Sequence, residues 1–252
     1  MNIFVCVKQV PDTETKVQPN GDGTFIETSS IKWIMNPYDE FAVEQALLVK
    51  AANAGSTVTV VRVGSVKDTE ALRTAMAMGA DEAILVEADD NLDSYSIAKA
   101  IKGGIEKSGK DVGLVLCGKQ AIDDDCNQTG QLLASMLDLP QATFASEIEF
   151  DGDSHLIVTR EIDAGLQKVR VSIPSVLTCD LRLNVPRFAK IQDISKAKKK
   201  KIDTINLSDL DIDVEPRLKT SKVASPETRE GGVMVESVDE LIDKLKNEAK
   251  VL

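Results

Sequence analysis

Short apolar runs alternate with amphipathic stretches along the first half of the chain. The runs are too short and too rich in β-branched residues to be helices, so we expect buried strands. They lie at Ile3–Val7, Thr57–Val63, Ala83–Val86 and Val112–Cys117. The stretches between them repeat apolar residues at helical spacing, as in Phe41–Val49, Lys67–Gly79 and Ser94–Lys107. Asp39 is a possible N-cap of the first predicted helix.

This alternation predicts an α/β fold of the doubly wound, Rossmann-like type. Buried strands joined by amphipathic helices indicate βαβ crossovers, which place a mostly parallel sheet between two layers of helices. In such sheets a ligand binds beyond the carboxyl ends of the strands, where the strand order reverses. We therefore expect functional residues in the loops after Val7, Val63 and Cys117.

The pattern changes after Thr143, where short strands and turns predict a small antiparallel excursion from the sheet. The predicted strands are Phe144–Phe150, Leu156–Arg160 and Leu166–Ile173, followed by a strand at Val176–Leu181 that rejoins the core. The predicted turns between them are Asp151-Gly152-Asp153 and Asp163-Ala164-Gly165.

Apolar periodicity is lost after Pro186, which predicts an extended C-terminal arm. We accordingly divide the chain into an α/β domain at residues 1–185 and an arm at residues 186–252. The arm ends in a predicted amphipathic helix at Ser237–Leu252. A polar segment of this length cannot readily offset its own ordering entropy, so it is either mobile or laid against another chain. The apolar face of the terminal helix favours the second alternative.

The composition excludes several classes of protein. A chain of 252 residues that is 42% hydrophobic and 28% charged is typical of a globular protein. The net charge of −11 argues against nucleic-acid binding, which needs clustered positive charge. The sequence has no run of about 18 apolar residues, so we expect no membrane insertion. The start of the chain lacks signal-peptide features, and we expect a cytoplasmic protein.

The cysteine and histidine content leaves little scope for catalysis. The four cysteines (Cys6, Cys117, Cys126 and Cys179) include no closely spaced pair, so we predict no zinc or iron–sulfur site. His155 is the single histidine and follows a predicted turn, which argues against a serine hydrolase triad. We predict no catalytic residue.

The segment Gly118–Gln131 is the strongest candidate for ligand binding. Gly118 allows close approach to the backbone, and Asp123 to Asp125 can cap the helix expected at Leu132–Leu137. Unpaired N–H groups at a helix start bind phosphate. The segment matches neither the GxGxxG nor the Walker pattern, and an ordinary loop with a capping aspartate has the same features. The residues alone leave these two interpretations open.

Several motifs, spread in order over essentially the whole chain, resemble those of the electron-transfer flavoprotein β-subunit family. Besides the Gly118–Gln131 segment, they are Val7–Asp12 (VKQVPD), Met35–Glu40 (MNPYDE) with Ala42 and Glu44, Thr74–Asp81 (TAMAMGAD), Arg160–Asp163 (REID) with Gly165, and Leu181–Asn184 (LRLN) with Pro186 and Arg187. A collinear set of this kind is highly specific.

The resemblance implies an electron carrier subunit rather than an enzyme. In the family an α-subunit holds most of the flavin adenine dinucleotide (FAD), and the β-subunit holds an adenine nucleotide of its own. This nucleotide is AMP in one type and a second FAD in electron-bifurcating relatives. The residues Asp123–Gly130 resemble the AMP type. A nucleotide-hydrolysing enzyme on the same fold is a further alternative.

The family's binding residues correspond to a defined set of positions. For the nucleotide they are Cys6, Asn36, Pro37, Tyr38, Asp39, Val63, Gly118, Lys119, Gln120, Ala121, Ile122, Asp123, Asp124, Asp125, Cys126, Asn127, Gln128 and Thr129. Among these, Tyr38 matches an aromatic position near the flavin. A core or interface tyrosine is an equally good interpretation of Tyr38.

The resemblance also implies a docking loop at Arg187 to Lys196. In the family one apolar side chain anchors this loop to acyl-CoA and related dehydrogenases, and electrons pass on to a quinone reductase. Ile191 occupies the anchor position, so Arg187, Ile191 and Lys196 are candidate docking residues. The sequence departs from the family pattern at Ile191-Gln192-Asp193, where Leu-Pro-Asn is common. It also departs at Val185, where the family has an acidic residue.

Overall fold

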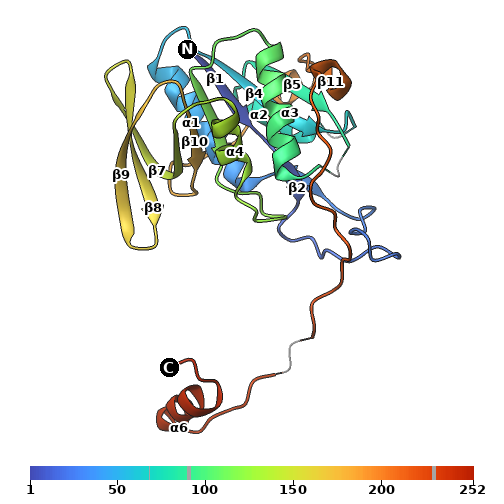
Figure 1. The fold of residues 1–252 in the computed structure, drawn as a ribbon, viewed down its shortest axis with the longest axis vertical. Coiled ribbons are helices and arrows are strands. Elements are labelled where there is room, and N and C mark those ends of the chain that lie inside the picture. Colours follow the sequence, from blue (N-terminus) through green and yellow to red (C-terminus); the bar gives the residue numbers. More distant parts are fainter. Residues whose placement is uncertain (68, 90–91, 229–230) are drawn as a thin grey trace.

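The computed structural model describes residues 1–67, 69–89, 92–228 and 231–252 (Figure 1). Its strands are β1 (Asn2–Cys6), β2 (Gln9–Pro11), β3 (Trp33–Met35), β4 (Thr57–Gly64), β5 (Glu82–Glu87), β6 (Leu114–Gly118), β7 (Gln141–Asp151), β8 (His155–Ile162), β9 (Gly165–Ser172), β10 (Ser175–Cys179) and β11 (Asp203–Asn206). Its α-helices are α1 (Pro37–Ala52), α2 (Glu70–Met78), α3 (Ser94–Lys107), α4 (Thr129–Met136), α5 (Ile191–Ala197) and α6 (Val238–Asp243). Leu207–Leu210 forms a 3₁₀ turn and Lys244–Glu248 a π-helical turn.

Most strands of the described residues form one sheet in the order β11-β5-β4-β1-β6-β10-β7-β8-β9. Neighbours from β11 to β7 pair in parallel, and β8 and β9 continue the sheet with antiparallel pairing. The predicted doubly wound sheet and its antiparallel excursion are therefore confirmed. Two elements, β2 and β3, form a separate antiparallel pair.

Helices cover both faces of the sheet (Figure 1). Ile3 and Val5 of β1 pack in a core with α1 and α2, whereas Phe4 and Cys6 belong to a second core with α3 and α4. This division follows from the alternation of side chains along a strand, because successive residues point to opposite faces. An apolar run that is buried on both faces is what a central parallel strand requires.

The strand order reverses beside β1. From β1 the chain passes through α1 to β4 and through α2 to β5, then returns through α3 to β6 on the other side of β1. Cys6 of β1 lies in register with Cys117 of β6. The carboxyl ends of β1 and β6 therefore form the switch point at which doubly wound sheets bind ligands.

Helix α1 begins earlier than its apolar pattern predicted. Its first residue is Pro37 and its N-cap is Asn36, so the expected N-cap role of Asp39 is wrong. Proline suits the first helical position because its missing N–H is not needed there. The apolar spacing starts only at Phe41, since the first turn carries polar side chains that serve the loops described below. Asp39 lies in that first turn and is buried.

Part of the C-terminal arm folds onto its own domain, contrary to the expectation of an extended segment held by another chain. Strand β11 pairs in parallel with β5, and Leu210 and Ile212 pack on the face covered by α3. A Cβ atom on Gly103 of α3 would lie 2.9 Å from Leu210 Cδ1, so this close approach needs glycine. The sequence signal was weak because β11 is a short edge strand with little apolar alternation.

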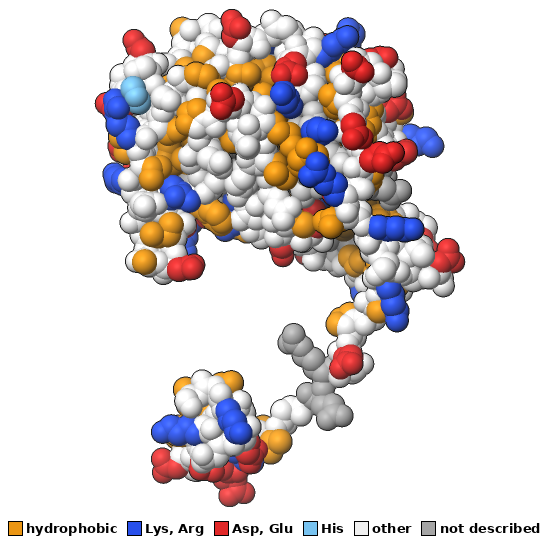
Figure 2. All heavy atoms as spheres, viewed as in Figure 1, with side chains coloured by type: hydrophobic (Ala, Val, Ile, Leu, Met, Phe, Trp, Pro, Cys, Tyr) orange, Lys and Arg blue, Asp and Glu red, His pale blue; other side chains and the backbone are white. Residues whose placement is uncertain are grey.

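The end of the arm is different. Beyond Val223, whose N–H donates to the Gly23 carbonyl, the chain leads away from the domain to α6 (Figure 1). Acidic and basic side chains gather on this terminal segment (Figure 2). The Oγ atom of Ser237 accepts from Glu240 N, which caps α6 where the predicted terminal helix begins. Residues 229–230 of the predicted arm, and residue 68 of the predicted second helix, lie outside the described residues.

Candidate functional site

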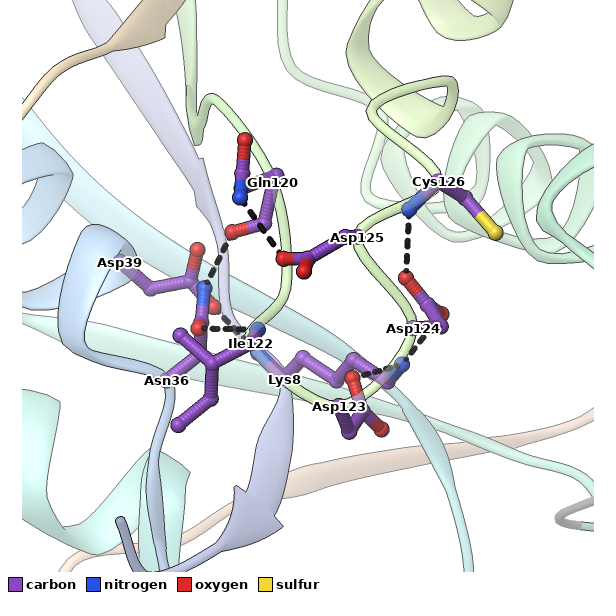
Figure 3. A network of polar contacts seen from close by, with 9 residues as sticks. All are labelled: Lys8, Asn36, Asp39, Gln120, Ile122, Asp123, Asp124, Asp125 and Cys126. Carbon is purple, nitrogen blue, oxygen red and sulfur yellow. Dashed lines mark hydrogen bonds and ion pairs between the residues drawn. The ribbon is translucent and has the colours of Figure 1, made fainter. Parts of the chain in front are cut away.

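The switch point is closed by the carboxylate of Asp39 (Figure 3). Its Oδ2 atom accepts the Lys8 N–H at 2.7 Å and its Oδ1 atom accepts the Gly118 N–H at 3.1 Å. One side chain of α1 therefore ties the segment after β1 to the end of β6. Burial raises the pKa of Asp39 to about 7, although these N–H donors act in the opposite direction.

Asn36 holds the following loop to the start of α1. Its Nδ2 atom donates to the Gln120 carbonyl at 2.9 Å, and its Oδ1 atom accepts the Ile122 N–H at 3.2 Å. The Asn36 side chain is buried and both of its polar atoms are used in these bonds. An amide presents one donor and one acceptor side by side, which is what pinning a loop by its backbone requires.

The acidic side chains of the loop contact other residues of the same chain (Figure 3). Lys8 Nζ lies 2.8 Å from Asp123 Oδ1 and 2.8 Å from Asp124 Oδ2, and Gln120 Nε2 donates to Asp125 at 2.7 Å. Burial acts to lower the pKa of Lys8, but the two aspartates outweigh it and raise that pKa. Lys8 offsets one of the three negative charges, and its ion pairs direct the Asp123 and Asp124 carboxylates toward its ammonium group.

The start of α4 has backbone donors that no side chain caps. The expected capping role of Asp123 to Asp125 is wrong, because α4 begins at Thr129 and its N-cap is Gln128, without a side-chain cap bond. Asp125 and Asn127 adopt left-handed φ angles of 50° and 49°, and this curls the loop away from the helix start. Free N–H groups at a helix start attract anions.

Gln131, in the first turn of α4, adds a further polar group. Its Nε2 atom donates to Asn127 Oδ1 at 2.7 Å. Its Oε1 atom is buried and has no hydrogen-bond partner within the described part of the chain. A buried acceptor of this kind costs free energy unless a ligand or water satisfies it. The residues present therefore fit a ligand that carries both phosphate and hydrogen-bonding groups.

Lys119 lies between two aromatic rings at the neighbouring strand ends. Its Nζ atom is 5.2 Å from the ring centre of Tyr38 and 5.4 Å from that of Phe144. It also forms an ion pair of 2.7 Å with Asp180, whose side chain is almost fully buried. Both the charge and the rings thus hold Lys119 in place. Phe144 has a φ of 58°, a strained value for an aromatic residue.

The remaining predicted nucleotide residues surround this centre. Cys6 is buried beside Cys117, and the hydrogen bond between the thiols, together with burial, raises the pKa of Cys6 well above its ordinary value. Val63 is half-buried near the end of β4. Cys126 is largely exposed. Partial desolvation of its thiol and, next, the negative charge of Asp124 raise its pKa. A neutral thiol at Cys6 and Cys126 does not act as a nucleophile.

The three predicted docking residues lie outside this centre. Arg187 is paired with Glu44 in the middle of α1. Ile191 begins α5 with its side chain exposed, and Lys196 of the same helix pairs with Asp193 at 3.3 Å. The structure thus groups the candidate residues into one cluster at the carboxyl ends of β1 and β6 and a separate segment beside α1 and α2.

Sequence reasoning gave no role to Lys8, Glu44, Phe144 or Asp180. Lys8 and Glu44 lie within the matched motifs, and Lys8 directly follows a predicted strand at the edge where ligands bind. That position is a usable signal for Lys8. Phe144 and Asp180 carried no such signal, since their importance depends on Lys119, which is distant in the sequence.

Of the helices in the described ranges, none has both the length and the apolar composition needed to cross a bilayer.

Comparison with known proteins finds similarity over the full chain. Residues 23–210 match the family described as electron transfer flavoprotein domain. The chain is 47% identical to the electron transfer flavoprotein subunit beta of Bradyrhizobium diazoefficiens over 252 residues, covering 100% of both chains. It is 46% identical to the mitochondrial subunit beta of Arabidopsis thaliana over 253 residues, again covering 100% of both. It is 44% identical to the human subunit beta over 255 residues, covering 100% of this chain and 99% of the human one.

Proposed function

This chain belongs to the family of electron transfer flavoprotein β-subunits, and on that premise we propose that it binds AMP and helps an α-subunit to hold FAD. The observation that carries the proposal is the loop Gly118–Thr129. Asn36, Asp39 and Lys8 hold this loop at the switch point, beside the uncapped start of α4. A β-subunit implies an α-subunit as its partner.

The proposed nucleotide is AMP and not a second FAD. The middle of the loop carries Asp123, Asp124, Asp125 and Cys126, where the bifurcating type has smaller residues. The ion pairs with Lys8 keep two of these side chains within the site, where they restrict its size. The phosphate of AMP is assigned to the N–H groups at the start of α4. The adenosine is assigned to the strand ends around Cys6 and Val63.

The proposed role of the chain is positioning rather than bond chemistry. FAD, when bound, supplies the acceptance and release of electrons. Asp39 and Asn36 order the backbone around the nucleotide, and Tyr38 with Lys119 presents an aromatic ring and a positive charge beside it. Such fixed charges tune a nearby cofactor without reorganising. We propose that Tyr38 faces the flavin of the α-subunit.

The proposed electron path runs from acyl-CoA and related dehydrogenases to a quinone reductase. The docking segment at residues 187–196 carries the proposed contact, since Ile191 is 83% exposed. A single buried aliphatic side chain contributes only about 1.5–3 kcal/mol, which suits a carrier that must release its partners quickly. The cytoplasmic location stays a prediction, and some relatives are named as mitochondrial.

Analysis of the nucleotides released from the co-purified αβ complex tests the proposal. Denaturation followed by mass spectrometry and absorbance is expected to yield one FAD and one AMP for each αβ pair. Two FAD would contradict the AMP assignment and favour the bifurcating type, and a colourless complex would contradict the electron-carrier function.

A pair of asparagine variants at the two ends of α1 sharpens this test. Asn36→Ala removes both bonds to the loop, so the AMP content is expected to fall while the FAD content stays. Asn53 caps the far end of the same helix, and its side chain bonds only to Val49 O within the described residues. Asn53→Ala is expected to keep both nucleotides. Equal AMP loss in the two variants would show general damage to α1 and not a specific loop contact.

A further inference from the structure

The docking segment is attached to α1 through Arg187. The Arg187 guanidinium binds the Glu44 carboxylate twice, with Nε to Oε2 at 2.7 Å and Nη2 to Oε1 at 2.8 Å. The Arg187 backbone N–H donates to the same carboxylate at 3.1 Å. One glutamate thus fixes both the side chain and the backbone of Arg187. We call these three bonds the Arg187–Glu44 clasp.

The clasp is sheltered from solvent on the side of Glu44. The Glu44 side chain is 6% exposed, whereas that of Arg187 is 45% exposed. Burial alone acts to raise the pKa of Glu44, but the hydrogen bonds and charge of Arg187 outweigh it and hold that pKa below its usual value. Glu44 in turn raises the pKa of Arg187. A buried carboxylate left without its arginine is strongly unfavourable, so the segment is held firmly.

A second contact lies just before the clasp. Asn184 Nδ2 donates to the Phe41 carbonyl at 3.0 Å and to Gln45 Oε1 at 3.2 Å. Asn184 and Arg187 therefore join the chain to the same stretch of α1. Pro186, between them, has a restricted φ, which limits how far this part of the chain can move.

The far end of the segment is fixed to another helix. Arg73 of α2 donates through Nη1 to the Ala197 carbonyl at 2.7 Å and to the Lys200 carbonyl at 2.5 Å. Ala197 is buried against the core that includes α1 and α2. The segment from Arg187 to Ala197 is thus held at its first residue by α1 and at its last residue by α2, in each case through an arginine.

Two apolar side chains between these two contacts are largely exposed to solvent. Phe188 is 98% exposed and Ile191 is 83% exposed. Exposed apolar side chains on a free loop would lose conformational entropy when a partner binds them. Because the contacts with α1 and α2 already order the backbone, less conformational entropy is lost when a partner binds. The pairing with Glu44 directs the guanidinium of Arg187, a predicted docking residue, toward α1.

We propose that Arg187 and Glu44 are positioning residues for docking, which hold residues 187–196 in the conformation that a partner dehydrogenase recognises. This inference rests on the proposed function, because the partner is the electron donor assigned above. The partner contributes an apolar cavity for Phe188 and Ile191. Arg187 makes its contribution through the backbone that carries these two side chains, and not through contact with the partner.

Hydrogen exchange and donor kinetics of the αβ complex test the proposal together. In Glu44→Gln the second oxygen is replaced by a donor, so the bidentate contact is lost. If only about one tenth of the molecules then hold the segment in the conformation that the dehydrogenase binds, the KM for the dehydrogenase rises about tenfold at unchanged kcat. The amides of residues 187–196 are expected to exchange faster, because the unfastened state of the segment is then the populated one. Nucleotide content is expected to stay at the wild-type level.

Two further variants keep the test decisive if Glu44→Gln folds poorly. Arg187→Lys retains the charge but cannot bind the carboxylate in two places, so intermediate KM and exchange values are expected. Glu106→Gln removes a surface pair with Lys102 on α3 and serves as the matched control, with no change expected.

Wild-type exchange and KM in both clasp variants would overturn the proposal. A rise in KM without faster exchange at residues 187–196 would also overturn it, because Arg187 would then contact the partner directly. Failure of the wild-type complex to take electrons from a dehydrogenase would contradict the proposed function instead. The exchange comparison would still decide whether the clasp orders the segment.

Discussion

The proposed nucleotide loop Gly118–Thr129 and the proposed docking segment 187–196 are both tied to helix α1, yet they carry different chemistry. The start of α1 holds the loop through Asn36 and Asp39, and Glu44, further along the helix, holds the segment. In the loop, carboxylates are held by contacts with Lys8 and Gln120. The segment is held by Arg187 on Glu44 and exposes the apolar side chains of Phe188 and Ile191.

The difference shows what each kind of binding demands. A permanently bound nucleotide needs fixed donors at the strand ends and the helix start, in a place that solvent does not reach. A protein that is bound and released needs a few exposed apolar side chains on a backbone that is already ordered. One helix can serve both because its successive turns face different parts of the chain.

The largest effect on the free energy of unfolding is expected where the loop meets α1. A Cβ atom at Gly118 would lie 2.3 Å from Asp39 Oδ1 and 2.7 Å from Tyr38 Cβ. Gly118→Ala must therefore displace the start of α1, and we expect a loss of about 3 kcal/mol together with loss of the nucleotide. Urea denaturation and nucleotide analysis of the αβ complex measure both.

Gly21→Ala is the control for this change. A Cβ atom at Gly21 meets no atom within 4 Å in the described residues, so we expect a change within about 1 kcal/mol and full nucleotide content. If Gly118→Ala behaved like Gly21→Ala, the close approach of the loop to α1 would not matter for the site.

A change in the free energy of unfolding that is smaller at each pH unit, but dependent on pH, is expected from Asp39. Its folded-state pKa of about 7 lies above the ordinary value of 3.8, so between these pH values the folded chain holds a proton that the unfolded chain has lost. The free energy of unfolding should therefore fall as pH rises from about 4 to about 7, by at most roughly 1.4 kcal/mol per pH unit, and then level off. Asp39→Asn should lack this contribution.

Urea denaturation at several pH values, for wild type and variant, measures the difference. Asp153→Asn, in the exposed turn between β7 and β8, should follow the wild-type curve. Superimposable curves for wild type and Asp39→Asn would mean that the Lys8 and Gly118 donors balance the burial of the carboxylate.

The smallest effect on stability, with a clear effect on function, is expected in the docking segment. Ile191→Ala should change the free energy of unfolding by less than about 0.5 kcal/mol, because the side chain is largely exposed. Electron transfer from dehydrogenases should slow about tenfold with flavin content intact, as a buried aliphatic contact is lost.

Stopped-flow reduction of the αβ complex by a dehydrogenase measures this rate. Leu218→Ala removes a side chain of similar exposure elsewhere on the arm and should leave the rate unchanged. An unchanged rate in Ile191→Ala would remove that residue as the anchor.

Much of the fold could be predicted because its signals are local. Ile3 to Cys6 are apolar without interruption, which marks a strand buried on both faces, and Ile97, Ile101 and Ile105 mark one side of α3. The turn at Asp163-Ala164-Gly165 was predictable for the same reason, and Gly165 has a φ of 124°. The start of α1 and strand β11 were not predictable, because neither has an apolar repeat of its own.

The candidate site was predictable in its place but not in its construction. The alternation of elements predicted functional loops after β1 and β6, the structure brings these loops together, and the motifs supplied Gly118–Thr129. The inward turn of Asp39, the pairing of Lys8 with Asp123 and the clasp of Arg187 on Glu44 were not foreseen.

The sequence by itself therefore determined the order of strands and helices, the edge of the sheet at which we propose that ligands bind and, through its motifs, the family. Only the tertiary structure decided which charges meet. Lys8 and Asp123 are 115 positions apart, and Arg187 and Glu44 are 143 apart. The apolar period records which face of one element is buried, and it carries no information about the distant side chain that will lie opposite.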